Sequence, residues 1–408
     1  MIKKILGLII AAAWSLAVGA QPMKSIQEFG VLPTNSPEVN RANLQRAIDE
    51  SSRSGSALYV EPTEKGYPMS AGIVLKQNVS LIGAHGPVGR GTANIERTAP
   101  VGSLFVITDN SEVFITVESA TQIRGIQFYY PEQSHTDASK IIVYPATIRV
   151  SQTQKVEGVT LSSLTFFGEY QAMDFRANPR FPCEQILFEH CYGYPLGGEF
   201  ISIDYCYDIP RILHCHVNPA NMRRFGRSFG RSVIDSVVAR PTFSFAIDHT
   251  DNAQLMDVFT FGVHGGILLG EHSYGQLTNF NLDCVSVGIH KKGASTFNRN
   301  WQIAQGSIIA NVRGCAEAIH PIIIEGQGHT AISNVEAFSG KNGALTTDGY
   351  SDDVVLVRGN QPLTVSLYGC RMRNYRSADP ITVENPQARI CAVACVDNAE
   401  QFFSQPAK

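Results

Sequence analysis

The chain has 408 residues, a formal net charge of −3 at pH 7 and 44% hydrophobic residues, which is enough for a large folded core. Lys and Arg form no long cluster, so the sequence argues against nucleic-acid binding, which depends on neutralising phosphates. No apolar segment after the first twenty residues is long enough to cross a bilayer, so we expect no membrane span.

Residues 1–20 have the pattern of a cleavable signal peptide. Lys3 and Lys4 precede an apolar run from Ile5 to Val18, and small residues end at Ala20. This run is too short, and too close to a small-residue cleavage site, to predict a transmembrane helix. We therefore expect a mature chain that begins at residue 21 and is secreted or periplasmic.

Residues 25–92 are expected to form an N-terminal cap and the first coils of the fold. Ser36 can cap a helix that has Pro37 at its first position and ends at Gly55. One face of this helix carries Leu44, Ala47, Ile48 and Ser51. Short strands are predicted at 57–60 and 79–82.

A repeat covers residues 123–400. Its pattern is apolar, any, apolar, any, any, then apolar or Cys, as in Val159, Leu161 and Leu164. Copies that start at residues 277, 303 and 332 have Asn279, Gln305 and Asn334 at the middle position. A second short strand is predicted after most copies, at 172–175, 200–203, 245–247, 267–269, 287–289, 322–324, 354–357 and 381–383. A unit of this size cannot bury its apolar face alone, so it must stack on copies of itself. We predict an all-β chain in which residues 21–408 form one single-stranded parallel β-helix with a capping α-helix.

All nine cysteines lie between Cys183 and Cys395, and their spacing predicts pairs on neighbouring coils. Cys206 follows Cys183 by 23 residues, and Cys215 follows Cys191 by 24. Adjacent parallel strands lie within the range that a disulfide spans. Disulfides and a stack of reduced, buried thiols are both compatible with this spacing.

The N-terminal region resembles that of the pectate lyase superfamily (pectin lyase-like proteins), particularly the group related to glycoside hydrolase family 28. The resemblance rests on the capped helix, on the coil repeats and on short motifs around it: Ile26, Glu28, Phe29, Gly30, Gly66, Tyr67, Gly72, Ile73, Leu75, Val79, Leu81, Ile82 and Gly83. It implies a right-handed parallel β-helix over nearly the whole mature chain. Members of the superfamily are mostly polysaccharide lyases and hydrolases, with phage tailspikes and non-catalytic surface proteins among them.

The polygalacturonase pattern itself is matched only loosely. Residues 263–266 (VHGG) and 289–292 (IHKK) are similar to its Gly-His-Gly and Arg-Ile-Lys motifs. Its Asn-Thr-Asp motif is missing, and the doublet of Asp352 and Asp353 follows the histidine instead of preceding it. Endo-polygalacturonase activity is therefore not expected.

Polar residues follow the predicted second strands: Asp204, Asp248, Glu271, His290, Glu325, Arg358 and Glu384. Strand spacing places Asp248, Glu271 and His290 on consecutive coils, where we expect a ladder of acid and base groups. When two carboxyl groups stack, the pKa of one rises and the other stays ionised. Glycoside hydrolysis needs such a pair, one group as the acid and the other as the base or nucleophile. These three are the predicted catalytic residues, although polar residues at strand ends also commonly serve only to hydrogen-bond turns.

The predicted substrate contacts are mainly cationic, as binding of a uronate carboxylate requires. They are Lys291, Lys292, Arg223, Arg224, Arg227 and Arg231, together with His264 and Asp204. Arginines on a Gly-containing loop can also form a solvated face without function.

No cofactor is required by this pattern, but oxygen ligands from Asp248, Asp251 and Asp283 could hold calcium. We expect an exported protein that cleaves an acidic or pectin-like polysaccharide, by hydrolysis or by β-elimination, in a groove along the β-helix. The alternative is a non-catalytic β-helix that binds glycans or a surface partner. The sequence leaves the oligomeric state open.

Overall fold

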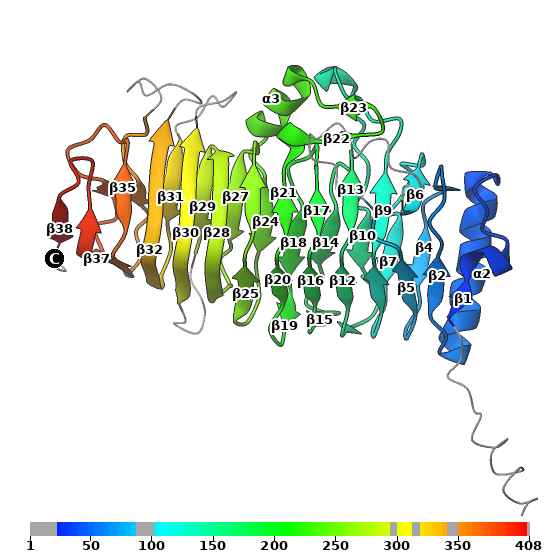
Figure 1. Ribbon diagram of the computed structural model, residues 1–408. Coiled ribbons are helices and arrows are strands. Elements are labelled where there is room, and N and C mark those ends of the chain that lie inside the picture. Colours follow the sequence, from blue (N-terminus) through cyan, green and yellow to red (C-terminus); the bar gives the residue numbers. More distant parts are fainter. Residues whose placement is uncertain (1–22, 87–101, 294–299, 312–318, 341–349, 406–408) are drawn as a thin grey trace, which may run out of the picture.

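The computed structural model describes residues 23–86, 102–293, 300–311, 319–340 and 350–405. The predicted signal peptide lies outside these ranges. The described chain winds into one elongated stack of coils, with α2 (Pro37–Ser54) at one end and β38 (Phe402–Gln405) at the other (Figure 1). Within the described ranges no helix is long and apolar enough to cross a membrane.

An 11-stranded parallel sheet forms one side of the stack. Its strands follow one another in chain order from coil to coil: β4 (Ile73–Leu75), β7 (Ile115–Val117), β10 (Ile148–Val150), β14 (Met173–Arg176), β18 (Ile201–Asp204), β24 (Phe243–Ile247), β27 (Gly265–Leu269), β29 (Val287–Lys291), β31 (His320–Ile324), β33 (Val355–Val357) and β36 (Ile381–Val383). The last eight coincide, within a few residues, with the predicted second strands, which confirms that part of the repeat.

A 22-stranded sheet forms the rest of each coil. In addition to β38 it contains β1 (Lys24–Ser25), β2 (Leu58–Val60), β3 (Tyr67–Met69), β5 (Ser80–Gly83), β6 (Ser103–Ile107), β8 (Gln122–Arg124), β9 (Ile126–Tyr129), β12 (Thr160–Ser162), β13 (Thr165–Phe167), β16 (Leu187–Glu189), β17 (Tyr192–Gly193), β20 (Arg211–Leu213), β21 (His216–Val217), β25 (Ala253–Met256), β26 (Phe259–Phe261), β28 (Gly275–Val285), β30 (Trp301–Asn311), β32 (Gly328–Gly340), β34 (Leu363–Tyr368), β35 (Arg371–Arg373) and β37 (Ala388–Val396). Three short strands, β11 (Val156–Glu157), β15 (Cys183–Glu184) and β19 (Cys206–Tyr207), pair in a third sheet.

From β8 onward, the described coils bend inside the 22-stranded sheet at a residue with left-handed backbone geometry. Positive φ angles occur at successive coils in Ser163, His190, His214, Asp257, Asn279, Gln305 and Asn334. Asn and Asp tolerate this conformation better than most residues, because their short polar side chains bond locally. The bend divides each coil into two limbs, so the sequence motif spans two strands.

The observed register corrects the predicted alignment of three repeats. One inward-facing row runs through Leu161, Phe188, Ile212, Leu255 and Leu277. Leu277 is the first residue of its triplet, whereas Leu161 is the middle residue of its triplet. The copies that start at residues 277, 303 and 332 are therefore displaced by two residues relative to the copy that contains Leu161. Asn279 occupies the bend instead of an inward position, which is why a polar residue is tolerated there.

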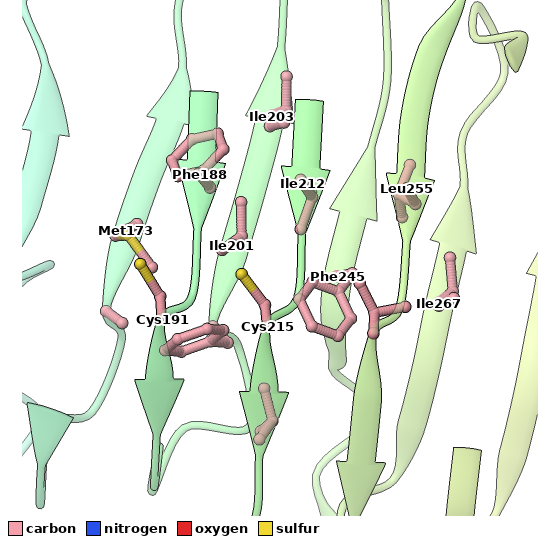
Figure 2. Packing of buried hydrophobic residues seen from close by; sticks show 14 of the residues in the cluster. Met173, Phe188, Cys191, Ile201, Ile203, Ile212, Cys215, Phe245, Leu255 and Ile267 are labelled. Atoms are coloured by element: carbon pink, nitrogen blue, oxygen red, sulfur yellow. The ribbon is translucent and has the colours of Figure 1, made fainter. Parts of the chain in front are cut away.

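The core lies between the two large sheets and is built from rows of like residues. Figure 2 shows Phe188, Ile212 and Leu255 facing Met173, Ile201, Phe245 and Ile267 across the interior. All of these except Ile212 and Leu255, each at 1%, are fully buried. Such burial contributes roughly 25 cal/mol for each Å² of apolar surface removed from water.

The predicted capping helix is confirmed. Ser36 accepts a hydrogen bond from the Val39 amide, and Gly55 ends the helix with a φ of 71°. Leu44, Ala47 and Ile48 are fully buried and cover the apolar end of the first coils. The cap therefore shields the hydrophobic edge that a solenoid otherwise exposes.

The stacking of the cysteines is confirmed by the register. Cys183 pairs directly with Cys206 on the neighbouring strand. Tyr192 pairs with His216, so the residues just before them, Cys191 and Cys215, also lie side by side. The eight cysteines in the described ranges are free thiols, and Cys315 lies outside those ranges. Of the two predicted states, the structure has the stack of buried thiols; their sulfurs fill the interior, as Figure 2 shows for Cys191 and Cys215.

Replacing Phe188 by Ala is expected to lower the free energy of unfolding by about 3–5 kcal/mol, because it leaves a cavity between the two sheets. Urea unfolding followed by circular dichroism measures the change. Tyr368→Ala is the matched control, because Tyr368 is 59% exposed on β34. Equal losses in the two variants would contradict the assignment of Phe188 to the core.

Candidate functional site

Polar side chains gather where the strands of the 11-stranded sheet end. Ile247 pairs with Leu269, and this row continues through Lys291, Ile324 and Val357. The residues one step further on are Asp248, Gly270, Lys292, Glu325 and Arg358. We call this region, with its neighbours on the same turns, the strand-end surface: Asp204, Asp248, His249, Glu271, His272, His290, Lys292, Glu325 and Arg358.

Two carboxylates and two imidazoles meet at one end of the strand-end surface. His249 Nδ1 lies 2.8 Å from Asp204 Oδ1 and 3.6 Å from Asp248 Oδ1. The ring of His249 stacks between Tyr205 and His272, with centroid separations of 4.1 Å on both sides. Asp248 also accepts hydrogen bonds from the backbone amides of His249 and His272, so its carboxylate is held in place.

The two carboxylates share one imidazole nitrogen, and this arrangement changes their acidity. Burial raises the pKa of Asp204, the hydrogen bond with His249 opposes that rise, and the nearby charge of Asp248 adds to it. A carboxyl group with a raised pKa beside a second carboxylate is the arrangement that acid and base catalysis requires. Of the two carboxyl groups, Asp204 is the one whose pKa is raised.

A second polar cluster lies three strands further along the sheet. Glu325 Oε1 accepts from His290 Nε2 at 2.6 Å and from Arg358 at 2.6 and 2.8 Å. Burial lowers the pKa of His290, against the opposing effect of Glu325. Burial would raise the pKa of Glu325, but its hydrogen bonds with Arg358 and His290 lower it overall. At neutral pH the cluster holds a neutral imidazole, a carboxylate and a guanidinium.

A groove of about 380 Å³ lies between the two clusters. Its sides carry Glu271, His272, Lys292 and Glu325, and Asn360 and Gln361 line its far end. The floor is formed by Gly293, Gly326 and Gly359, which follow one another on successive coils with positive φ.

Two of these glycines are required by close packing. A Cβ on Gly293 would lie 2.5 Å from Glu271, and one on Gly326 would lie 2.1 Å from the carbonyl oxygen of Gly293. The floor is therefore bare backbone, and a ligand can approach it closely.

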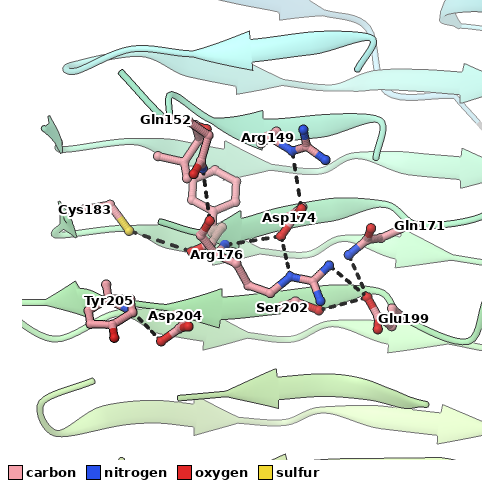
Figure 3. Close-up of polar contacts among 12 residues, drawn as sticks. Arg149, Gln152, Gln171, Asp174, Arg176, Cys183, Glu199, Ser202, Asp204 and Tyr205 are labelled. Atoms are coloured by element: carbon pink, nitrogen blue, oxygen red, sulfur yellow. Dashed lines mark hydrogen bonds and ion pairs between the residues drawn. The ribbon is translucent and has the colours of Figure 1, made fainter. Parts of the chain in front are cut away.

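Ion pairs extend the same face toward the N-terminus. Figure 3 shows Asp174 between Arg149 and Arg176, with Arg176 also reaching Glu199. The Nε atoms of Arg149 and Arg176 lie 3.3 and 2.7 Å from Asp174. This network was not among the predicted site residues, although alternating residues on strands that face water indicate it.

The predicted catalytic ladder is only partly formed. Asp248, Glu271 and His290 do belong to three consecutive strands or their ends, but they are not in register. Glu271 comes one residue after Gly270, the partner of Asp248 in the row, while His290 pairs with Leu268 within the strand. The residue in register with Asp248 two strands away is Lys292. The structure instead brings Asp248 together with Asp204, His249 and His272.

Lys291 does not face the groove, which corrects its predicted role as a carboxylate binder. Its ammonium points into the coil and donates to the carbonyl oxygens of Gly293, Glu325 and Gln327 at 2.8 to 3.0 Å. Burial lowers its pKa to about 8. Lys292, the next residue, is exposed and lines the groove.

The predicted arginine loop folds into a hairpin and a helix away from the groove-lining residues. Arg223 and Arg224 lie on β22 (Arg223–Arg224), Arg227 begins β23 (Arg227–Ser228), and Arg231 begins α3 (Arg231–Ala239). Arg224 is buried over the ring of Phe225, which itself packs on Tyr129, so this aromatic ring is not a free sugar platform. Arg231 pairs with Asp235 at 3.2 Å.

His264 is buried at the other end of β27 from the strand-end surface. Its Nδ1 lies 3.2 Å from the carbonyl oxygen of Val238 in α3. The side chain is therefore part of the packing between α3 and the coil.

The predicted calcium ligands are not brought together. Asp283 lies on β28 in register with Phe261, whereas Asp248 follows β24 in the other sheet. Asp248 instead forms a group with His249 and His272 in which one ligand atom of each lies within 4.8 Å of the others. Imidazole ligands favour transition metals over calcium, so this group suits calcium poorly.

Removing the charge of Glu325 is expected to lower the pKa of His290, because the carboxylate stabilises the imidazolium. The Glu325→Gln variant tests this by NMR titration of the imidazole carbons. Lys292→Gln is the matched control and should shift the pKa of His290 upward, since Lys292 destabilises the imidazolium. Shifts of the same sign in the two variants would contradict the described cluster.

No known family profile matches the sequence, and no curated protein matches it. Several solved structures are similar to this chain in fold. The A-module of the Azotobacter vinelandii mannuronan C-5 epimerase AlgE6 is 13% identical, with 93% of this chain and 100% of that chain covered and a TM-score of 0.53. A hyperthermoactive exopolygalacturonase from Thermotoga maritima is 12% identical, with 95% of each chain covered and a TM-score of 0.52.

The tailspike of E. coli bacteriophage HK620, solved with a pentasaccharide, is 12% identical; the match covers 90% of this chain and 66% of that chain, with a TM-score of 0.57. At these identities the matches are evidence of fold alone. Together with the sheet topology, they show that this chain has a right-handed parallel β-helix fold.

Proposed function

We propose that this protein binds an acidic polysaccharide along the strand-end surface and hydrolyses it there. The observation that carries the proposal is the pair of carboxylates, Asp204 and Asp248, whose oxygens lie 2.8 and 3.6 Å from His249 Nδ1. The groove beside them has the composition that a uronate chain requires: Lys292 to attract a carboxylate, and acidic and amide side chains to hydrogen-bond hydroxyl groups.

In this reaction Asp204, whose pKa is raised by burial, donates its proton to the glycosidic oxygen as the bond to the anomeric carbon breaks. Asp248 accepts a proton from the water that adds to that carbon. The products are a new reducing end and a free hydroxyl group. At the end of the reaction Asp204 has lost one proton and Asp248 has gained one. His249 positions both groups through its ring nitrogen.

The comparisons support a polysaccharide ligand without specifying the reaction. The structures similar to this chain include an epimerase named for mannuronan, an exopolygalacturonase and a tailspike solved with an oligosaccharide. The first two names refer to polymers of uronic acids. Export of the chain by residues 1–20 remains part of the proposal, because such polymers lie outside the cytoplasm.

A specific observation favours β-elimination as a second candidate. His290 is a neutral imidazole beside Glu325 and Arg358, and a neutral imidazole can remove the proton α to a uronate carboxylate. Arg358 or Lys292 would bind that carboxylate while the bond to the leaving oxygen breaks, which gives an unsaturated product. His290 is only 9% exposed at its side chain, so the substrate has less access to it than to Asp248, at 38%.

Incubation of the mature protein with polygalacturonate, alginate and neutral control polysaccharides is expected to release reducing ends from a uronate polymer without new ultraviolet absorbance. Asp204→Asn and Asp248→Asn should each lower this rate by at least about a hundredfold, as expected for loss of a general acid or base, with unchanged circular dichroism. An increase in absorbance would transfer the assignment to elimination at His290. If neither signal appears and the protein still binds the polymer, the chain is a non-catalytic binder.

The rate of hydrolysis is expected to fall as the pH rises through the pKa of Asp204, because the proton donor is then lost. His249 lowers that pKa by its hydrogen bond and charge. His249→Phe keeps a stacked ring but removes the donor, so the alkaline limb of the pH–rate profile should move to higher pH. His272→Phe is the control and should leave the limb in place. A limb that does not move in His249→Phe would show that Asp204 is not the titrating acid.

A further inference from the structure

A second groove, of about 600 Å³, runs over the bend of the 22-stranded sheet and shares no residue with the strand-end surface. It crosses β26, β28, β30 and β32, the last three of which run side by side in Figure 1. Two outward-facing rows line it. The bend row carries Asp257, Asn279, Gln305 and Asn334, and the limb row carries His216, Phe259, Asn281 and Ser307.

The limb row begins with a stack of aromatic rings that ends inside the groove. The ring centroids of His216 and Phe259 lie 4.3 Å apart with an interplanar angle of 24°, and His216 follows Tyr192 on the coil before. On the next coil the position of Phe259 is taken by Asn281, which has no ring. The face of Phe259 turned away from His216 therefore forms the end of the hollow, as a flat apolar platform.

Beyond this platform the groove is lined by uncharged hydrogen-bonding groups. Asn279, Asn281, Gln305 and Asn334 are exposed, and Ser307 is half-buried. Their side chains make no hydrogen bond to any other residue in the described ranges, so their donors and acceptors are available to a ligand. The carboxylate of the row, Asp257, already bonds His214 at 2.8 Å.

This combination selects one class of ligand. An apolar ring face packs against the C–H groups of a pyranose, while amides and hydroxyls both donate to and accept from its hydroxyl groups. Among the described residues no Lys or Arg lines the groove, so it offers no cationic partner to a phosphate or to a uronate carboxylate. We propose that the bend groove is a second, non-catalytic binding site for a neutral glycan, with Phe259 as the stacking residue and the bend amides as hydrogen-bonding partners.

The test is affinity electrophoresis of the Asp248→Asn variant in gels that contain galactomannan, xylan, mixed-linkage glucan or polygalacturonate. Use of this variant separates the groove from cleavage, since the result does not depend on whether the strand-end surface is catalytic. We expect retardation by at least one neutral polysaccharide. Adding Phe259→Ala should weaken that retardation roughly tenfold, as for loss of an aromatic anchor, and Phe259→Trp should retain it. Tyr368→Ala, at an exposed aromatic outside the groove, should bind as the parent does.

Three results would overturn the proposal. One is the absence of retardation by every neutral polysaccharide, and another is equal retardation of the Phe259→Ala and parent proteins with unchanged circular dichroism. The third is a dimer in sedimentation velocity that Phe259→Ala dissociates, because a second copy of the chain would then be the occupant of the groove.

Discussion

The rest of the structure depends on one constraint, the residue-by-residue register of parallel hydrogen bonding between successive coils. Every coil donates and accepts backbone hydrogen bonds on both sides, so a shift by one residue would turn the inward row from Leu161 to Leu277 toward water. Burial of that row fixes the register, and the register places every outward residue opposite its counterpart one coil away. In the described part of the chain, the 11-stranded sheet has its edges at the two ends of the stack, and α2 lies at the first end.

Because outward residues also stack, the surface of the molecule consists of rows in which each side chain contacts its neighbours on adjacent coils. Where the neighbours differ in charge, the row neutralises itself, as Arg149, Asp174 and Arg176 do. Where carboxylates meet, as Asp204 and Asp248 do near His249, burial raises the pKa of Asp204 and the charge of Asp248 adds to the rise. Stacking thus brings ionisable groups of neighbouring coils together at the strand-end surface.

The left-handed bend also shapes the second groove. A bend on every coil requires residues that tolerate positive φ, and Asn and Gln at these places bring a row of amides to the exterior. On the other side of the coil, glycines adopt the same positive φ. Gly293, Gly326 and Gly359 have no side chain and form the floor of the groove beside the carboxylates. One backbone conformation therefore produces either a hydrogen-bonding row or an open groove, depending on the side chain.

The sequence by itself determined the parallel β-helix, the capping helix, the second strands and the stacked cysteines, because these follow from local periodicity and from the need to bury it. It also identified Asp204, Asp248, Glu325 and Arg358 as strand-end residues. Only the tertiary structure decided which of them meet. The turns between strands differ in length, so spacing along the chain did not show that His249 lies close to both Asp204 and Asp248. For the same reason it did not show that Glu271 is out of register with His290. It did not show that Lys291 points inward either, because the side of a strand that a residue faces is set by the pairing of the whole coil.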